Sequence, residues 1–162
     1  MRSLSDKQDS ESVLPGRGLV LGGYSKEDGS VELTPVAQNY DSRACGGSLT
    51  SMVNRFCPKL KKGDHRVFYG LGDEHVAIAI VNVGPKKPDA PLEDRDEYLE
   101  CVRAASGAGV LALDKVGVKD IQVEDFGQAT ASAEGSVLSS FQFDKLKSDP
   151  RVPITILSLI HI

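Results

Sequence analysis

The stretch Val76-Ala-Ile-Ala-Ile-Val-Asn-Val83, closed by Gly84-Pro85, decides the fold of this chain. Seven of these eight residues are apolar and five are β-branched, so the stretch favours the pleated conformation. A strand with one solvated face would alternate apolar and polar residues, and this stretch does not. We therefore predict a central strand covered on both faces, as in a parallel or mixed α/β sheet. A buried helix is the alternative, but eight residues ending in Gly-Pro favour the strand.

Apolar segments on either side of this strand predict an alternation of strands and helices. The expected order is strand, helix, strand, strand, helix, strand, helix, strand, which gives a three-layer α/β/α fold with a mixed sheet. Gly46-Gly47 interrupts the first helical pattern and should weaken or break that helix. A short turn at 72–74 leads into the central strand, so the two strands around it can pair as a hairpin. Strands are expected near 18–24, 66–71, 76–83, 118–123 and 151–156, and helices near 36–56, 93–112 and 125–149.

The last predicted helix has the clearest pattern. Asp125 can cap it, with Gln128 three residues later in a variant of the capping box. Pro153 cannot donate to a ladder, so the strand that follows is predicted at a sheet edge. The predicted buried face of this helix repeats at i+4 spacing and consists of Ala129, Ala133, Val137 and Phe141, with Leu138 and Leu146 alongside. The face of the preceding helix consists of Tyr98, Val102, Ala105, Gly109 and Ala112.

The sequence divides into three segments. Residues 1–16 are predicted to be a disordered leader, because the chain starts with polar residues and lacks the apolar core of a secretion signal. Residues 17–156 are predicted to form the folded domain. Residues 157–162 are oily and end abruptly, and an exposed apolar tail is an aggregation liability. We interpret these last residues as a truncation or as residues foreign to the gene.

The composition is that of an ordinary globular domain. With 162 residues, of which 40% are hydrophobic and 26% charged, the chain can bury one full-sized core. The net charge of −4 offers no basic surface for nucleic acid, and no apolar run approaches the ~20 residues of a membrane span. Cys45, Cys57 and Cys101 lack CxxC spacing, which argues against a disulfide framework or a structural zinc site. We therefore expect a cytoplasmic protein without a nucleic-acid or membrane partner.

The histidines and cysteines form no recognisable catalytic or metal-binding pattern. His65 lies in a predicted loop and His75 directly precedes the central strand, and neither has a second ligand at a metal-binding spacing. A surface or strand-end histidine is the preferred interpretation of each. Cys101 lies among charged residues of both signs on a predicted helix, so packing is a better interpretation than reactivity.

The glycine-rich and acidic stretches give weak signals. Gly16-Arg-Gly18 and Gly70-Leu-Gly72 lack the third glycine of a dinucleotide fingerprint. Gly84-Pro85 ends the central strand, where open α/β sheets often bind ligands, although a plain turn is the preferred interpretation. The acids between 93 and 97 fit the solvated start of a helix better than a metal site. The residues alone therefore predict no catalytic, cofactor-binding or metal-binding side chain in this chain.

Four segments, in the right order and spacing, resemble a known family. They are 18–27 (GLVLGGYSKE), 60–71 (LKKGDHRVFYGL), 127–138 (GQATASAEGSVL) and 141–146 (FQFDKL). Together they resemble the amino-terminal domain of the cytosolic leucine aminopeptidases, over about residues 17–156. No single segment is specific, and the assignment depends on all four together.

The resemblance implies a macrodomain-like α/β/α fold and a place in a two-domain, homohexameric exopeptidase. That enzyme releases amino-terminal residues from peptides with two divalent ions, zinc with manganese or magnesium exchangeable. Its metal ligands and catalytic residues belong to a carboxy-terminal domain, whose motifs do not occur here, so no catalytic residue is carried over. This chain departs from the family where Gly46-Gly47 interrupts a helix and where the segment after the central strand is shorter.

Three functions remain open at this point. The preferred one is a non-catalytic amino-terminal domain, here a fragment that is inactive without its catalytic domain. The second is a free-standing module that assembles with full-length aminopeptidase subunits or binds a nucleotide-like ligand as macrodomains do. The third, far less favoured, is an enzyme that uses Cys101 or His75.

Overall fold

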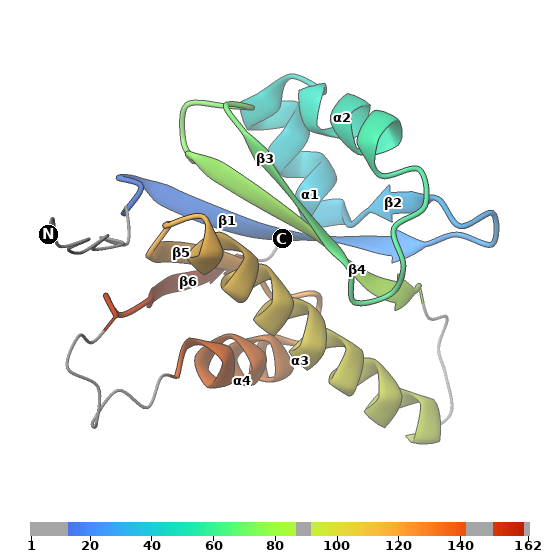
Figure 1. The fold of residues 1–162 in the computed structure, drawn as a ribbon. Coiled ribbons are helices and arrows are strands. Elements are labelled where there is room, and N and C mark those ends of the chain that lie inside the picture. Colours follow the sequence, from blue (N-terminus) through green and yellow to red (C-terminus); the bar gives the residue numbers. More distant parts are fainter. Residues whose placement is uncertain (1–12, 87–91, 142–150, 161–162) are drawn as a thin grey trace, which may run out of the picture.

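A mixed sheet lies between two helical layers in the computed structural model, which describes residues 13–86, 92–141 and 151–160 (Figure 1). The strands are β1 (Arg17–Ser25), β2 (Val31–Leu33), β3 (His65–Tyr69), β4 (Ala77–Pro85), β5 (Asp120–Glu124) and β6 (Thr155–Ile160). The helices are α1 (Pro35–Tyr40), the π-helix η1 (Asp41–Cys45), α2 (Ser48–Phe56), α3 (Leu92–Lys115) and α4 (Ala129–Ser140). One layer contains α1, η1 and α2, and the other contains α3 and α4.

The strand order is β3-β4-β1-β5-β6, with the short β2 paired to β1. β1 is parallel to β4 and to β5, and β5 is parallel to β6. β2 and β3 are antiparallel to their neighbours, and β3 forms with β4 the hairpin predicted from the short turn between them. The predicted three-layer fold with a mixed sheet is confirmed, whereas β2 was missed because three residues are too few for a periodic signal.

The stretch at 76–83 forms β4, an inner strand with both faces covered. Every residue from Ala77 to Gly84 is buried. Ile78 and Ile80 face the layer of α1 and α2, whereas Ala79 and Val81 face α3 and α4. The predicted double coverage is confirmed, although β1 rather than β4 occupies the middle of the sheet.

The first predicted helix is divided into α1, η1 and α2. Gly46 and Gly47, with φ of 59° and 86°, adopt the left-handed conformation that glycine tolerates best, and so end η1 as predicted. Gly47, which precedes α2, has no side chain to cap the helix, and Asp41 caps it instead. Its two carboxylate oxygens accept hydrogen bonds from the backbone N–H groups of Leu49, at 2.9 Å, and Thr50, at 3.0 Å.

Helix α4 buries a different face from the predicted one. Val137 and Phe141 are 58% and 73% exposed, whereas the buried residues are small: Ala131, Ser132, Gly135 and Ser136. Asp125 does not cap α4, because its Oδ1 accepts a hydrogen bond from the N–H of Gly127 instead. The prediction was wrong because a helix that packs closely on another helix uses small residues rather than large apolar ones. Leu146 lies outside the described residues.

The two ends of the predicted domain also need revision. Leu14 donates its backbone N–H to the carbonyl oxygen of Gly117 at 2.8 Å, so the packed chain begins before residue 17. β6 extends to Ile160 and pairs with β5 beyond the predicted boundary at residue 156. Residues 1–12 and 161–162 lie outside the described part of the chain, as do the side chains of the acids at 93, 94 and 96. The origin of the last residues stays a prediction.

Candidate functional site

The carboxyl ends of β1, β4 and β5 meet at one edge of the sheet, where open α/β folds often place ligands. The last residue of β5, Glu124, is only 1% exposed there. Its Oε2 accepts hydrogen bonds from the N–H of Gly22 on β1 and from the hydroxyl of Thr34, each at 2.8 Å. Burial raises the pKa of Glu124 to about 7, although these two hydrogen bonds oppose the shift. The edge therefore contains a carboxyl group that titrates near neutral pH.

Aromatic side chains fill this edge beside Glu124. Phe126 has a positive φ of 54° and directs its ring into the space that a side chain at Gly22 would occupy. Tyr98 of α3 donates its hydroxyl to the carbonyl oxygen of Phe126 at 2.9 Å, which fixes the loop between β5 and α4. Burial raises the pKa of Tyr98, so the phenol stays protonated and remains a donor.

The end of β4 at Gly84-Pro85 lies against the side chain of Lys62. A Cβ at Gly84, where φ is 108°, would lie 3.3 Å from Cδ of Lys62. The Nζ of Lys62 lies 3.5 Å from Oε1 of Glu97, and interaction with Cys101 raises its pKa. Gly84 and Pro85 are the last two residues of β4 and pair with Tyr24 and Ser25 of β1, so their interpretation as a plain turn is wrong. The stem of Lys62 packs on Gly84.

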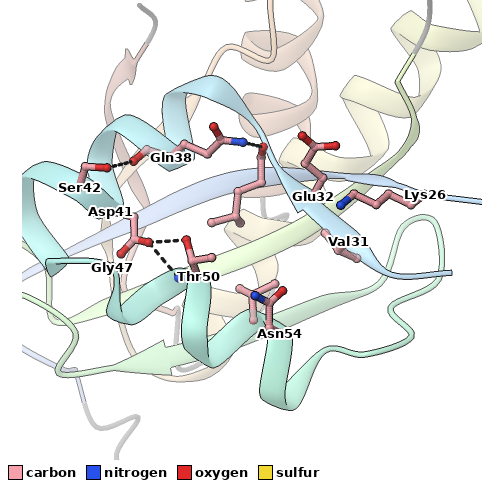
Figure 2. A pocket seen from close by; sticks show the side chains of 11 residues that line it. Lys26, Val31, Glu32, Gln38, Asp41, Ser42, Gly47, Thr50 and Asn54 are labelled. Carbon is pink, nitrogen blue, oxygen red and sulfur yellow. Dashed lines mark hydrogen bonds between the residues drawn. The ribbon is translucent and has the colours of Figure 1, made fainter. Parts of the chain in front are cut away.

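A groove of about 540 Å³ lies between β2, α1 and α2 (Figure 2). Most of its polar groups already stabilise the fold. Asp41 caps α2 as described, and Gln38 donates its Nε2–H to the carbonyl oxygen of Leu33 at 2.8 Å. Lys26 and Glu32 line the rim from the β1–β2 hairpin. The groove offers one charge of each sign at its rim and no cluster of catalytic groups among its lining residues.

The chain matches the model of the cytosol aminopeptidase family, N-terminal domain, over residues 20–150. It belongs to the cytosol aminopeptidase family. It is 34% identical over 144 residues to the cytosol aminopeptidase of Sus scrofa, and 33% identical to that of Homo sapiens. The alignment with Dictyostelium discoideum cytosol aminopeptidase is 31% identical over 135 residues. The mammalian alignments cover 86% of this chain and 27% of each relative, so the chain spans about a quarter of their length and corresponds to their amino-terminal domain.

Solved structures show the same fold at low sequence identity. The macrodomain of Thermus aquaticus DarG matches with a TM-score of 0.55 and 13% identity, over 92% of this chain and 91% of that one. The macrodomain of Mycobacterium tuberculosis DarG matches with a TM-score of 0.53 and 12% identity, over 88% of this chain and 87% of that one. This aminopeptidase domain is therefore macrodomain-like in fold, as the resemblance implied.

The two candidate histidines of this cytosol aminopeptidase domain lie apart. His65 starts β3 at the sheet edge, so its predicted position in a loop is wrong. His75 lies before β4 but is 6% exposed, so its interpretation as a surface residue is wrong and its strand-end position is confirmed. Its Nδ1 lies 2.7 Å from the hydroxyl of Tyr40 and its Nε2 2.6 Å from Oε1 of Gln122. His75 thus connects α1 to β5, and burial raises the pKa of Tyr40 to about 12.

The cysteines are also distributed over the fold. Cys45 and Cys57 are buried, and burial raises the pKa of each thiol. Cys101 is partly exposed on α3. Across residues 13–86, 92–141 and 151–160, no three His, Cys, Asp or Glu side chains gather where they could hold a metal ion. No helix within those ranges is long and apolar enough to cross a membrane.

Sequence reasoning missed Glu124, a buried carboxyl group whose pKa burial raises to about 7. A signal was present, because Glu124 directly follows the apolar residues of β5 and precedes a second acid. A carboxylate at the end of a buried strand is a site where burial can shift a pKa. The pattern does not reveal that Gly22 and Thr34, distant in sequence, enclose it.

Proposed function

We propose that this chain is the non-catalytic amino-terminal domain of a leucine aminopeptidase. The full-length enzyme would be a cytoplasmic two-metal exopeptidase that releases amino-terminal residues from peptides. One observation carries the proposal: residues 20–150 match the family's amino-terminal domain, and the chain aligns with about a quarter of the relatives' length. Its partners would be the catalytic domain and the other subunits of a homohexamer.

Within the described ranges, the acidic side chains do not gather into a site for the two divalent ions of such an enzyme. Asp41 directs both carboxylate oxygens at the backbone of α2. Glu124 is enclosed by β1 and Thr34, with one oxygen accepting both of its hydrogen bonds. A two-metal site needs clustered carboxylates that hold and bridge the ions. We therefore place zinc, manganese or magnesium in the catalytic domain and assign no reaction step to this chain.

An assay with leucine p-nitroanilide tests this proposal. The purified chain, with zinc or manganese added, should show no turnover above the buffer background. A full-length cytosol aminopeptidase assayed in parallel is the positive control. Metal-dependent hydrolysis that persists after removal of contaminating aminopeptidase would contradict the proposal.

The similarity to macrodomain structures supports a second candidate, a free-standing binding or assembly module. This module would bind a nucleotide-like ligand or join full-length aminopeptidase subunits. Calorimetric titration with ADP-ribose as the probe, together with co-purification with a full-length aminopeptidase, separates the candidates. Saturable heat of ADP-ribose binding, with a dissociation constant in the micromolar range, would favour the binding module. Co-purification with the aminopeptidase, without heat from ADP-ribose, would favour the assembly module.

A further inference from the structure

The Glu124 carboxyl joins β5 to two other parts of the fold. Its Oε2 accepts both the backbone N–H of Gly22 on β1 and the hydroxyl of Thr34, which lies between β2 and α1. From the part of the chain that the structure describes, no hydrogen bond reaches Oε1. The backbone carbonyl oxygen of Glu124 accepts a third bond, from the hydroxyl of Ser132 on α4, at 2.7 Å. The carboxyl group itself therefore holds β1 and the β2–α1 connection together.

Thr34 connects this carboxyl group to the first turn of α1 through two hydrogen bonds. Its side chain is fully buried, and its hydroxyl has one hydrogen, which it donates to Glu124. The same oxygen accepts the backbone N–H of Ala37 at 3.2 Å and so caps α1. The orientation of the cap thus depends on Glu124 remaining in place.

The surroundings of Glu124 disfavour its charged form. Asp125, the adjacent acid, raises its pKa further, and no described cationic side chain forms an ion pair with it. Tyr98 of α3 lies near this edge, and burial raises its pKa, so it stays a neutral phenol beside the carboxyl group. From the β2–α1 side, the hydroxyl of Thr34 donates a hydrogen bond to the carboxyl group. Among the described residues, ionised Glu124 is therefore a buried charge without a counter-ion.

We propose that Glu124 is a proton-operated latch on the segment formed by β2 and α1. With the carboxyl protonated, the segment closes on the sheet and Oε2 retains both hydrogen bonds. With the carboxyl ionised, the closed state buries an uncompensated charge, so the segment opens more often to hydrate it. The proposal concerns the conformation of this domain and is independent of its role in an aminopeptidase.

The direction of the pH effect follows from the two proton affinities. The closed state holds the proton more tightly than the open state, where Glu124 has the ordinary affinity of a solvated glutamate. The closed state therefore loses stability as the pH rises from about 4.5 to about 7, and the loss is complete above that range. Over this range the equilibrium constant for opening should rise on the order of a hundredfold.

Amide hydrogen exchange, corrected for the intrinsic rate at each pH, tests the latch on the full chain. The N–H groups of Gly22 and Ala37 report on the latch, and that of Ile80 in β4 reports on the rest of the sheet. Between about pH 5.5 and about pH 8, protection of Gly22 and Ala37 should fall at least tenfold more than protection of Ile80. Equal changes at all three amides would overturn a local latch.

Two matched variants assign the effect to one carboxyl group. Glu124→Gln keeps an acceptor oxygen for Gly22 and Thr34 but cannot ionise, so protection of both reporter amides should become independent of pH. Glu32→Gln makes the same chemical change at an exposed position on β2 and should leave the wild-type pH dependence intact. A Glu124→Gln protein that retains the wild-type pH dependence would overturn the proposal.

A measurement on the unmodified protein applies even if Glu124→Gln does not fold. Carbon-13 NMR of the glutamate side-chain carboxyl groups should show one residue, assigned to Glu124, that titrates near pH 7. A midpoint for Glu124 below about pH 5, in the ordinary range for glutamate, would overturn the latch.

Discussion

The two helical layers meet the sheet in different ways. On the face of α1 and α2, large side chains fill the space between helix and strand, among them Leu19, Leu21, Leu49, Ile78 and Ile80. On the other face, a side chain at Gly109 of α3 would collide with Val20 of β1, and one at Gly135 of α4 would collide with the backbone of α3. The first layer should therefore be sensitive to lost volume, which leaves a cavity between helix and strand. The second should be more sensitive to added volume, because its elements already touch.

The largest effect is expected from Ala79→Asp, which disrupts the packing of β4 against the layer of α3 and α4. Ala79→Asp places a carboxylate on a fully buried position of β4 that faces α3 and α4. The side chains of the cluster that contains Ala79 are apolar, so the new carboxylate would be a buried charge in apolar surroundings and the domain should unfold. Circular dichroism of the purified variant measures the outcome. A folded Ala79→Asp protein would contradict the double coverage of β4.

Ile80→Ala tests the first layer by removing volume. The side chain is fully buried against α1 and α2, so truncation should leave a cavity and lower the free energy of unfolding by about 2–5 kcal/mol. Urea denaturation at fixed pH measures the change. Ile80→Val, which removes one methylene group, is the graded control and should cost about 0.5–1.5 kcal/mol. Equal costs for the two variants would show that the cavity collapses.

Gly135→Ala tests the second layer by adding volume. The new methyl group would meet the carbonyl oxygen of Arg103, so α3 and α4 must separate, at a cost of about 1–3 kcal/mol. This cost should exceed the gain in helix propensity of about 1 kcal/mol from replacing glycine. Ala129→Ser adds one heavy atom at an exposed position of the same helix and should change stability by less than about 0.5 kcal/mol. A Gly135→Ala protein that is more stable than the wild type would refute the close contact.

The smallest expected effect concerns the edge of the sheet. Deleting residues 157–162 removes most of β6, which pairs with β5, and should lower the thermal midpoint. A loss of about 1 kcal/mol corresponds to roughly 2–4 °C in a domain of this size. Deleting only residues 161–162, beyond the end of β6, should leave the midpoint unchanged. An unchanged midpoint for the longer deletion would support the boundary at residue 156 predicted from the sequence.

The sequence predicted those parts of the fold in which apolar residues mark burial. The unbroken run that became β4 and the face of α3 made by Val102, Ala105, Gly109 and Ala112 were identified because buried residues there are apolar or small at regular spacing. The same rule failed for α4. Its inner face carries serines that donate to backbone carbonyls, Ser132 to Glu124 and Ser136 to Ser132, and hydrophobic periodicity does not detect such residues.

The polar groups of the candidate site were not predictable, because each depends on partners distant in sequence. Glu124 is enclosed by Gly22 and Thr34, which lie 102 and 90 positions away in the sequence. His75 contacts Tyr40 and Gln122, at sequence separations of 35 and 47 residues. A single sequence indicates residue types and local spacing, but these enclosures are set by the crossover order of the strands. The resemblance to a family identified the domain without identifying either group.

The position of β1 in the sheet has a consequence for synthesis of the protein. β1 leaves the ribosome first among the strands, yet its parallel partners β4 and β5 begin only at Ala77 and Asp120. The ribosome adds about 5–20 residues per second. Synthesis of the segment between β1 and β4 therefore leaves the apolar residues Leu19, Val20 and Leu21 without a parallel partner strand for roughly 3–10 s. Of the neighbours of β1 in the described sheet, the three-residue β2 is the one already synthesised during this interval. The nascent chain therefore carries an apolar segment that a ribosome-associated chaperone can bind until β4 emerges.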